Sequence, residues 1–377
     1  YDAQYGRSGG GHVSTTLRGG TNRWHGSVVD FWRNRVLDAN TRQNNAGGQR
    51  RGFRNQHQFS GVLGGPIRKD RDFVFVSMEA WRSRLPFPIV STVPPAEIRG
   101  GNFNFIPAGE RTTILVFDQL TSVPCTAGVA CISGGVYVRQ PFPGNVIPAS
   151  RVSAVGRSIV NLYPAPNFNP SGLTQNFLRA ENTGRYRYEQ PMARWDHIFE
   201  GNDRFSFVFQ FFDGTEFRNS NGFDPPAQNG NMMSWRRNWT YIASYDKTIT
   251  PTQILRVQAS YNRFIQNFPN VSDPAYTWDK LGVKNIPLVP TYPTKAPPAV
   301  TLSGFTGILG SQYLNESSRQ QINFQANMSQ TLRRHGLKYG FEWAQLLHHT
   351  RASGNASGAW TFADTWSRQH YGRRLAS

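Results

Sequence analysis

The chain has 377 residues and a formal net charge of +18, although only 17% of its residues are charged. The net charge reflects a shortage of acids, because 23 Asp and Glu residues stand against 41 basic residues, of which six are lysine. Fifty aromatic residues exclude an intrinsically disordered chain, and two cysteines exclude a disulfide-dense scaffold. No apolar run reaches the roughly 18 residues that a membrane-spanning helix requires. The length predicts two or three domains, or one unit if the chain is rich in β-structure.

Glycine is concentrated near the start of the chain. The stretch from Tyr5 to Gly11 reads YGRSGGG, and no Lys-Ser or Lys-Thr follows it, so it lacks the signature of a phosphate-binding loop. Glycine permits two backbones to approach closely. The sequence therefore favours a mechanical role for this segment.

The two cysteines, Cys125 and Cys131, enclose five residues in a stretch rich in proline and glycine. Such a short loop predicts a local disulfide in an oxidising compartment. Two free thiols in a cytosolic loop are the alternative that the sequence leaves open. The spacing does not match a pair of zinc ligands, and no His or Cys cluster lies nearby.

Alternation with a period of two dominates the rest of the chain and predicts β-strands. In one such stretch, Leu255, Val257 and Ala259 fall on one face, while Arg256 and Gln258 fall on the other. The clearest alternating stretches are residues 205–212, 239–247, 255–263, 322–329 and 337–343.

Short polar turns alternate with long loops between these strands. The turns lie near residues 66–73, 199–205, 247–254 and 332–337, and the long loops lie near residues 36–55, 85–186, 214–236, 268–319 and 349–360. This asymmetry predicts an all-β fold, namely an antiparallel transmembrane β-barrel with short periplasmic turns and long extracellular loops. An ordinary antiparallel sheet with one buried face gives the same alternation and is the alternative.

A series of short motifs occurs in a fixed order along the chain. They are YGRSGGG at 5–11, GGTN at 19–22, WHGS at 24–27, RN at 33–34, RNQHQFSG at 54–61, GGPIRKD at 64–70, FVF at 73–75, PFPGNVIP at 141–148, LYPAPN at 162–167, RWDH at 194–197 and LKYGFE at 337–342. Their order and spacing resemble the Oar-like group of TonB-dependent outer-membrane receptors. The turn at Arg18-Gly19-Gly20 and the segment with the two cysteines depart from the pattern of that group.

The resemblance implies a division of the chain into two parts. Residues 1–22 would be the C-terminal end of a plug domain, and residues 23–377 would be the N-terminal part of the barrel. About nine or ten of an expected 22 strands would be present, with long extracellular loops at about 85–186 and 268–319, so a fragment of a longer receptor is expected. The residues expected at the plug–barrel junction are Tyr5, Gly6, Arg7, Gly9, Gly10, Gly11, Trp24 and Gly26.

The resemblance also implies a function and a location. Such a receptor lies in the outer membrane of a Gram-negative bacterium and takes up a nutrient ligand by energy-coupled movement of its plug. Its partners would be outer-membrane lipid, an unidentified nutrient, and the inner-membrane TonB complex, which would act through a segment absent from this chain. The sequence shows no catalytic constellation and no cofactor or metal motif, so we expect no enzyme activity.

Polar residues on the alternating strands are candidates for the lumen of the barrel. They are Asp30, Glu79, Arg194, Asp196, Arg256 and Glu342. A polar face without any specific role in ligand binding is the alternative. In the loops, Tyr163, Trp278 and Tyr313 are candidates for stacking on sugars, with packing inside the loops as the alternative.

Two other classes of protein remain open at this point. A secreted or surface-exposed β-rich adhesin or carbohydrate-binding protein fits the strands and turns. A basic nucleic-acid-binding protein fits the net charge and the adjacent aromatic and basic residues at Trp81-Arg82 and Trp235-Arg236-Arg237. The basic residues are spread over the whole chain, however, and no nucleic-acid-binding motif occurs, so we expect no nucleic-acid partner.

Overall fold

The structure is a computed structural model of the chain. It describes residues 16–46, 48, 50–86, 88–106, 113–125, 137–168, 173–179, 183–218, 220–228, 232–268, 276–285, 297–309, 314–353 and 357–367. Among these residues, no helix has both the length and the apolar character needed to cross a membrane.

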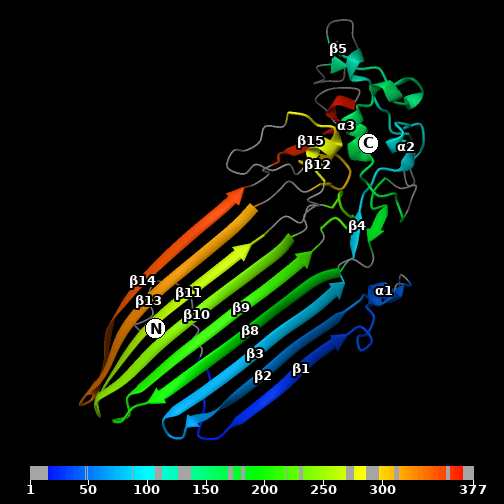
Figure 1. Cartoon of the computed structure of the whole chain (residues 1–377). Coiled ribbons are helices and arrows are strands. Elements are labelled where there is room, and N and C mark those ends of the chain that lie inside the picture. The colour runs from blue at the N-terminus through cyan, green and yellow to red at the C-terminus, as the bar shows by residue number, and fades with distance from the viewer. Residues whose placement is uncertain are drawn as a thin grey trace.

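One large antiparallel sheet contains the long strands (Figure 1). Within the described residues it has nine strands in the order β1-β2-β3-β8-β9-β10-β11-β13-β14. Their bounds are β1 His25–Asn34, β2 Asn55–Arg68, β3 Asp72–Pro86, β8 Thr183–Ile198, β9 Arg204–Arg218, β10 Met232–Thr250, β11 Gln253–Asn267, β13 Leu314–Leu332 and β14 His335–Ser353. The predicted all-β class is therefore confirmed.

The two faces of this sheet differ in chemistry because alternate side chains of a strand point to opposite faces. Phe209 of β9, Tyr241 of β10 and Tyr261 of β11 are direct cross-strand partners on one face. Their sequence neighbours Gln210, Thr240 and Asn262 are partners on the other face. The sheet thus has an apolar, aromatic face and a face rich in Asn, Gln, Ser and Thr.

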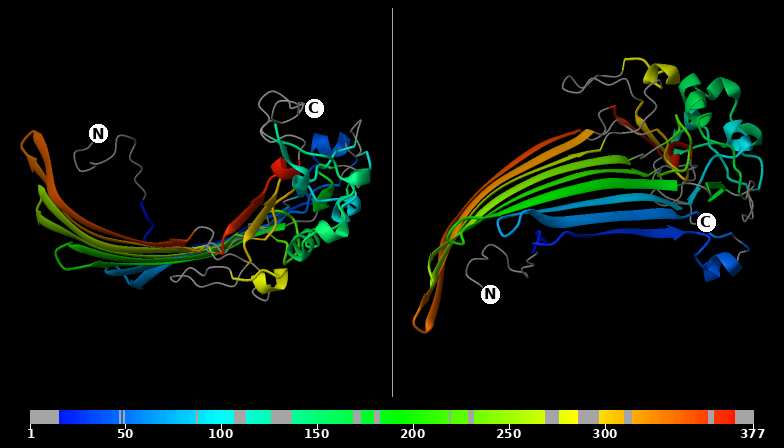
Figure 2. Two further views of the ribbon diagram at one scale, coloured as in Figure 1. Left: turned by 90° about the horizontal axis from the view of Figure 1, so that it is seen from above. Right: turned by 60° about the horizontal axis from the view of Figure 1, so that its bottom comes forward.

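The sheet is curved like a trough, as Figure 2 shows. Residues 16–22, which we call the N-terminal segment, run along the concave side of the trough. The segment contacts Arg194 and Asp196, which belong to the polar face. The polar face is therefore the concave one and the apolar face is convex, as expected for the lumen side and the lipid side of a transmembrane β-barrel, and we call the concave face the lumen face.

The connections confirm the predicted alternation of short turns and long loops. Residues 69–71, 199–203, 251–252 and 333–334 form the four short turns. Several strands extend further toward the loops than the sequence predicted, so the two longest loops span 87–182 and 268–313 instead of about 85–186 and 268–319. The ladder of backbone pairs continues to Leu314 and Ser353, and this pairing satisfies backbone groups that a loop would leave to water.

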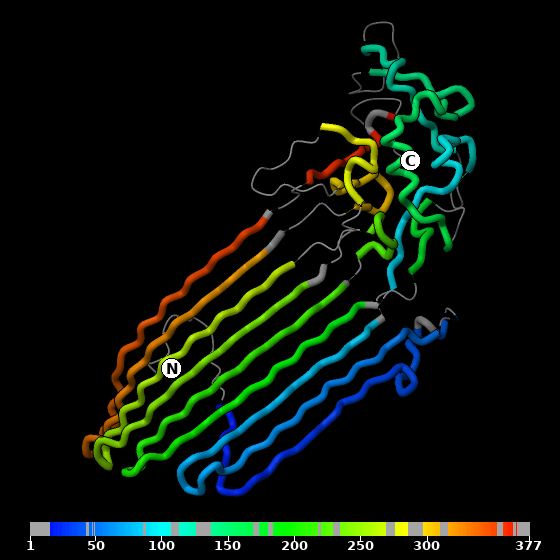
Figure 3. Tube along the Cα trace, viewed as in Figure 1, coloured from blue at the N-terminus to red at the C-terminus, as the bar shows by residue number. Residues whose placement is uncertain are grey.

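The long loops fold together beyond one end of the sheet (Figure 3). We call this body the loop unit. Its short elements are β4 Ile89–Ser91, α2 Ala96–Arg99, η1 Gln119–Thr121, β5 Val123–Pro124, β6 Tyr137–Val138, η2 Pro143–Asn145, η3 Ala149–Arg151, α3 Ala154–Val160, β7 Phe177–Arg179, η4 Trp278–Leu281, β12 Ala299–Leu302, β15 Ala359–Phe362 and η5 Asp364–Ser367. The small sheets β4-β7, β5-β6 and β12-β15 join segments within it. The remaining helix, α1 Arg42–Ala46, belongs to the separate connection between β1 and β2.

The loop unit has a hydrophobic core of its own, which we call the loop core. Three different loops contribute to it: residues 87–182, 219–231 and 268–313. Its buried members are Val93, Ile159, Tyr163, Phe177, Phe223, Ala227, Leu281, Val300, Ile308 and Leu309. Burial of this apolar surface holds the loops together as one folded body.

Buried asparagines fasten the loop backbones to one another. Asn176 is fully buried and forms two hydrogen bonds with the backbone of Val93, one donated and one accepted, each 2.8 Å long. The side-chain amide of Asn221 donates to the carbonyl oxygens of Ala227, at 3.0 Å, and Gly307, at 3.2 Å. Such side chains satisfy backbone groups in regions where no ladder can do so.

Candidate functional site

The N-terminal segment is held against the lumen wall by an arginine of β8. The Arg194 guanidinium donates to the carbonyl oxygen of Leu17 at 2.8 Å. It also forms an ion pair with Asp196, two residues along the same strand, with an Nη2–Oδ1 distance of 2.7 Å. Because alternate residues share a face, these two predicted lumen residues act as one polar unit.

Close backbone contact brings the same segment onto β2 and β3. A Cβ at Gly20 would lie 2.6 Å from the carbonyl oxygen of Val74 and 2.8 Å from that of Gly65. A Cβ at Gly64 would lie 3.0 Å from the Phe75 ring and 3.6 Å from the Cα of Gly20. Only glycine fits at position 20 without movement of the wall, and Phe75 is buried beneath the segment.

Glu79 lies nearer the loop end of the lumen face, within a local hydrogen-bond network. Gln58 donates its side-chain amide to Glu79 Oε1 at 3.0 Å, and the Tyr188 hydroxyl donates to the same oxygen. The Trp81 ring stacks on Tyr188, with ring centroids 6.0 Å apart. Oε1 of this predicted lumen residue therefore accepts hydrogen bonds from two neighbours on the wall.

Arg256 and Glu342 occupy the lumen face of other strands. Arg256 forms a two-point ion pair with Asp246 across β10 and β11, with distances of 2.6 and 2.8 Å. Glu342 accepts a hydrogen bond from Asn323 at 3.0 Å. Five of the six predicted lumen residues thus lie on the lumen face, but they form separate local pairs and do not converge on one site.

The prediction for Asp30 was wrong about the face of the sheet. Asp30 pairs directly with Phe59, which in turn pairs with Ala80 on the convex face. Its carboxylate lies 3.1 Å from Nδ1 of His57. The register between β1 and β2 decides the face, and on that register Asp30 is an outward-facing residue.

The predicted junction motif is only partly within the described residues. Tyr5, Gly6, Arg7, Gly9, Gly10 and Gly11 lie outside them. Trp24 lies over Gly65, where a Cβ would meet its ring at 2.3 Å. Gly26 permits β1 to approach β2, because a Cβ there would lie 2.5 Å from the carbonyl oxygen of Val62.

The lumen face also carries an array of side-chain amides, which the sequence analysis did not predict as a site. Asn262 donates to Asn238 Oδ1 at 2.9 Å and to Thr240 Oγ1 at 2.8 Å. A shallow hollow on this wall is lined by residues that include Asn238, Asn262, Gln321 and His348. The recurrence of Asn and Gln at every second position is the sequence signal that identifies such an array. Neutral amides can donate and accept hydrogen bonds, which suits them to a polar, hydroxyl-rich ligand.

Of the loop residues considered for stacking on sugars, Tyr163 has another role and Tyr313 lies outside the described residues. Tyr163 is buried in the loop core, and its hydroxyl donates to the carbonyl oxygen of Thr306 at 2.8 Å, so its ring is not available to stack on a sugar. Cys125 is disulfide-bonded. Cys131 and Tyr313 lie outside the described residues, and the Cys125–Cys131 pairing stays a prediction.

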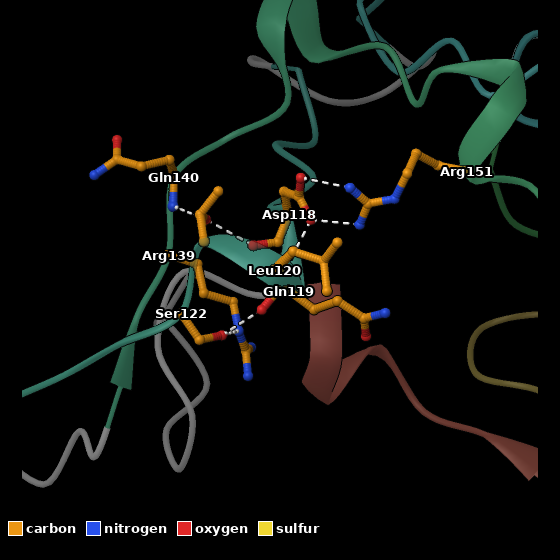
Figure 4. Close-up of polar contacts among 8 residues, drawn as sticks. Asp118, Gln119, Leu120, Ser122, Arg139, Gln140 and Arg151 are labelled. Carbon is orange, nitrogen blue, oxygen red and sulfur yellow. Dashed lines mark hydrogen bonds and ion pairs between the residues drawn. The ribbon is translucent and has the colours of Figure 1, made fainter.

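Polar contacts close to η1 hold the outer part of the loop unit (Figure 4). Arg151 donates to both carboxylate oxygens of Asp118, at 2.7 and 3.0 Å, and Leu120 donates its backbone N–H to the same side chain at 2.9 Å. The contact with Arg151, reinforced by the Leu120 N–H, holds the pKa of Asp118 below its usual value. Within the described residues, no group of three or more His, Cys, Asp or Glu side chains is arranged to hold a metal ion.

Comparison with known families agrees with this geometry. The chain matches the family model described as an outer membrane beta barrel domain over residues 16–376, and it therefore belongs to that family. The protein is thus an outer-membrane protein of Gram-negative bacteria. Searches of curated proteins and of solved structures gave no match.

Proposed function

We propose that this chain is part of a TonB-dependent receptor that takes up a nutrient through the outer membrane. Residues 1–22 are the end of its plug, residues 23–377 belong to its barrel, and its task is transport and not catalysis. The single observation that best supports the proposal is the N-terminal segment on the lumen wall, held by Arg194 and fitted closely at Gly20. A chain that enters the lumen before the first strand is what a plug connected to a barrel requires.

The chemistry of the wall supports a polar nutrient. Amides and hydroxyls cover the lumen face of β10, β11 and β13, whereas the described ion pairs on this face are satisfied internally. The loop unit stands at the extracellular end and presents a folded surface to an incoming ligand. We propose that a ligand first meets the loop unit and then the plug, whose movement opens a path along the amide-lined wall.

Genetics tests the energy coupling. Deletion of the gene for this protein should impair growth on one nutrient class within a panel of glycans, peptides and metal chelates. Deletion of the gene for TonB should impair growth on the same class. Growth on all classes without this protein, or uptake that persists without TonB, would contradict the proposal.

A cysteine tether tests the movement of the segment in the full-length receptor. A Cβ at Gly19 would lie 3.0 Å from the Asp196 carboxylate, so the pair Gly19→Cys and Asp196→Cys places two sulfurs within reach of each other. Oxidation should stop uptake, and a reductant should restore it. The two single variants are the controls, and uptake at the normal rate through a fully oxidised tether would show that this segment need not move.

A further inference from the structure

Four arginines form a cluster on the convex face at the loop end of β3 and β8. Arg82 is the direct cross-strand partner of Arg187, and Arg84 is the direct partner of Arg185. Arg84, Arg185 and Arg187 are exposed, and the side chain of Arg82 is 42% exposed. Like charges placed directly opposite each other in a sheet destabilise it. A bound anion would relieve this repulsion.

The protein itself neutralises only part of this cluster. Arg82 forms an ion pair with Glu189, and Arg187 donates to the Thr215 hydroxyl at 3.0 Å. Within the described part of the chain, Arg84 and Arg185 take part in no ion pair. Their guanidinium groups are left free to bind a ligand at the surface.

The position of the cluster relative to the lipid-facing surface identifies the ligand. On β3, the outward residues before the cluster are Val74, Val76, Met78 and Ala80, and on β8 they are Trp195, Ala193, Pro191 and Glu189, the last of which is the ion-pair partner of Arg82. The cluster therefore lies directly beyond the apolar band, on the side of the extracellular loops, where the headgroups of the outer leaflet lie.

Aromatic side chains mark the same level on the neighbouring strands. Trp32 of β1 and His57 of β2 continue the cross-strand row that contains Arg82 and Arg187. Trp32 is 47% exposed, and its ring stacks on His57 with ring centroids 6.0 Å apart. Tryptophan favours the boundary between apolar lipid and headgroups.

We propose that Arg82, Arg84, Arg185 and Arg187 form a binding site for the phosphate groups of a phosphorylated glycolipid in the outer leaflet. Guanidinium groups bind phosphate oxygens through two parallel hydrogen bonds. A phosphate between Arg84 and Arg185 removes the repulsion of that pair, while the acyl chains of the same lipid cover the aromatic band below. The site depends on the barrel wall and is independent of the nutrient that the receptor transports.

Binding of lipid A to the purified full-length protein in detergent, measured by native mass spectrometry, tests the proposal. Arg84→Gln/Arg185→Gln should bind bisphosphorylated lipid A about 30-fold more weakly than the wild type. Dephosphorylated lipid A should bind the wild type and this variant equally weakly. Millimolar inorganic phosphate should not displace the lipid, because the acyl chains contribute to its binding.

The control is a second double variant that loses two positive charges, as the cluster variant does, but at the opposite end of the sheet. Arg333→Gln/Arg334→Gln alters two exposed arginines in the turn between β13 and β14 and should bind lipid A as the wild type does. If the cluster double variant does not fold, Arg185→Gln alone should weaken binding about fivefold. Equal binding by wild type and cluster variant, equal losses in cluster and control variants, or displacement by inorganic phosphate would overturn the proposal.

Discussion

Individual glycines decide how closely the strands of the wall approach one another. A Cβ at Gly26 would lie 2.5 Å from a backbone oxygen of β2, whereas the nearest atom to a Cβ at Gly61 would be a side-chain carbon of Val28, 4.0 Å away. Gly26 pairs with Leu63, and Gly61 pairs with Val28, two residues further along β1, so both glycines lie on the same face of the sheet. They form a matched pair for substitution.

Gly26→Ala should destabilise the barrel by about 1–3 kcal/mol, because a backbone atom must move to admit the methyl group. Gly61→Ala should leave stability close to that of the wild type. The temperature at which the full-length barrel loses its compact mobility on detergent gels measures both. An equal loss of stability in the two variants would show that the close approach of β1 to β2 at Gly26 does not stabilise this edge of the sheet.

The ion pair of Asp118 with Arg151 gives the loop unit a dependence on pH. Pairing lowers the pKa of Asp118 below its usual value of 3.8, so the contribution to stability is complete above that value and is lost as the pH falls through the folded-state pKa. Asp118→Asn lacks this contribution at every pH. The ratio of variant to wild-type cleavage rates by pepsin should exceed one at about pH 4 and approach one at lower pH. A ratio that stays constant with pH would contradict the role of this carboxylate.

The face of the sheet on which a residue lies can be read from the sequence where alternation is regular. Glu79, Arg194, Asp196, Arg256 and Glu342 lie on strands with clear alternation, and the structure places them on the lumen face. Asp30 lies in the stretch VVDFW, where apolar residues occupy both faces. Only its register against β2 assigns a face to Asp30, and a register is not visible in a single strand.

At the scale of elements, the strands of the main sheet were predictable and the loop unit was not. Period-two patterns and short polar turns locate most of the long strands from sequence alone. The loop core is built from residues such as Val93, Phe223 and Leu281, which are far apart in the chain and belong to segments without a regular period. Contacts of this kind arise from tertiary packing, so local patterns do not reveal them.

The loop core predicts that the extracellular loops unfold together. Phe223 is 1% exposed and contacts the rings of Tyr163 and Phe177. Phe223→Ala should destabilise the loop unit by about 3–5 kcal/mol and expose both 87–182 and 268–313 to protease. Phe362→Ala, at a side chain that is 48% exposed, is the control. Cleavage confined to the loop that carries the substitution would contradict a shared core.

At the scale of the whole molecule, the net charge of +18 is distributed over surfaces with different roles. Arg194 and Arg256 are paired on the lumen face, Arg151 is paired in the loop unit, and Arg84 and Arg185 stand on the convex face. Within the described part of the chain, these paired and exposed arginines are divided among three surfaces, whereas a nucleic-acid-binding surface gathers them on one face. In an outer-membrane protein, the basic residues of the convex face lie next to lipid, and we propose that the arginine cluster binds lipid headgroups.

The assignment of the convex face to lipid underlies both the lumen face and the arginine cluster, and two adjacent residues on β9 test it. Phe209 faces outward between Ala193 and Tyr241, and Gln210 faces the lumen between Met192 and Thr240. Phe209→Arg should destabilise the barrel in the membrane by about 2–4 kcal/mol and reduce its assembly, whereas Gln210→Arg should assemble as the wild type does. The measurement is the amount of folded, heat-modifiable barrel in outer membranes. Normal assembly of Phe209→Arg together with loss of Gln210→Arg would reverse the two faces and contradict the proposed receptor.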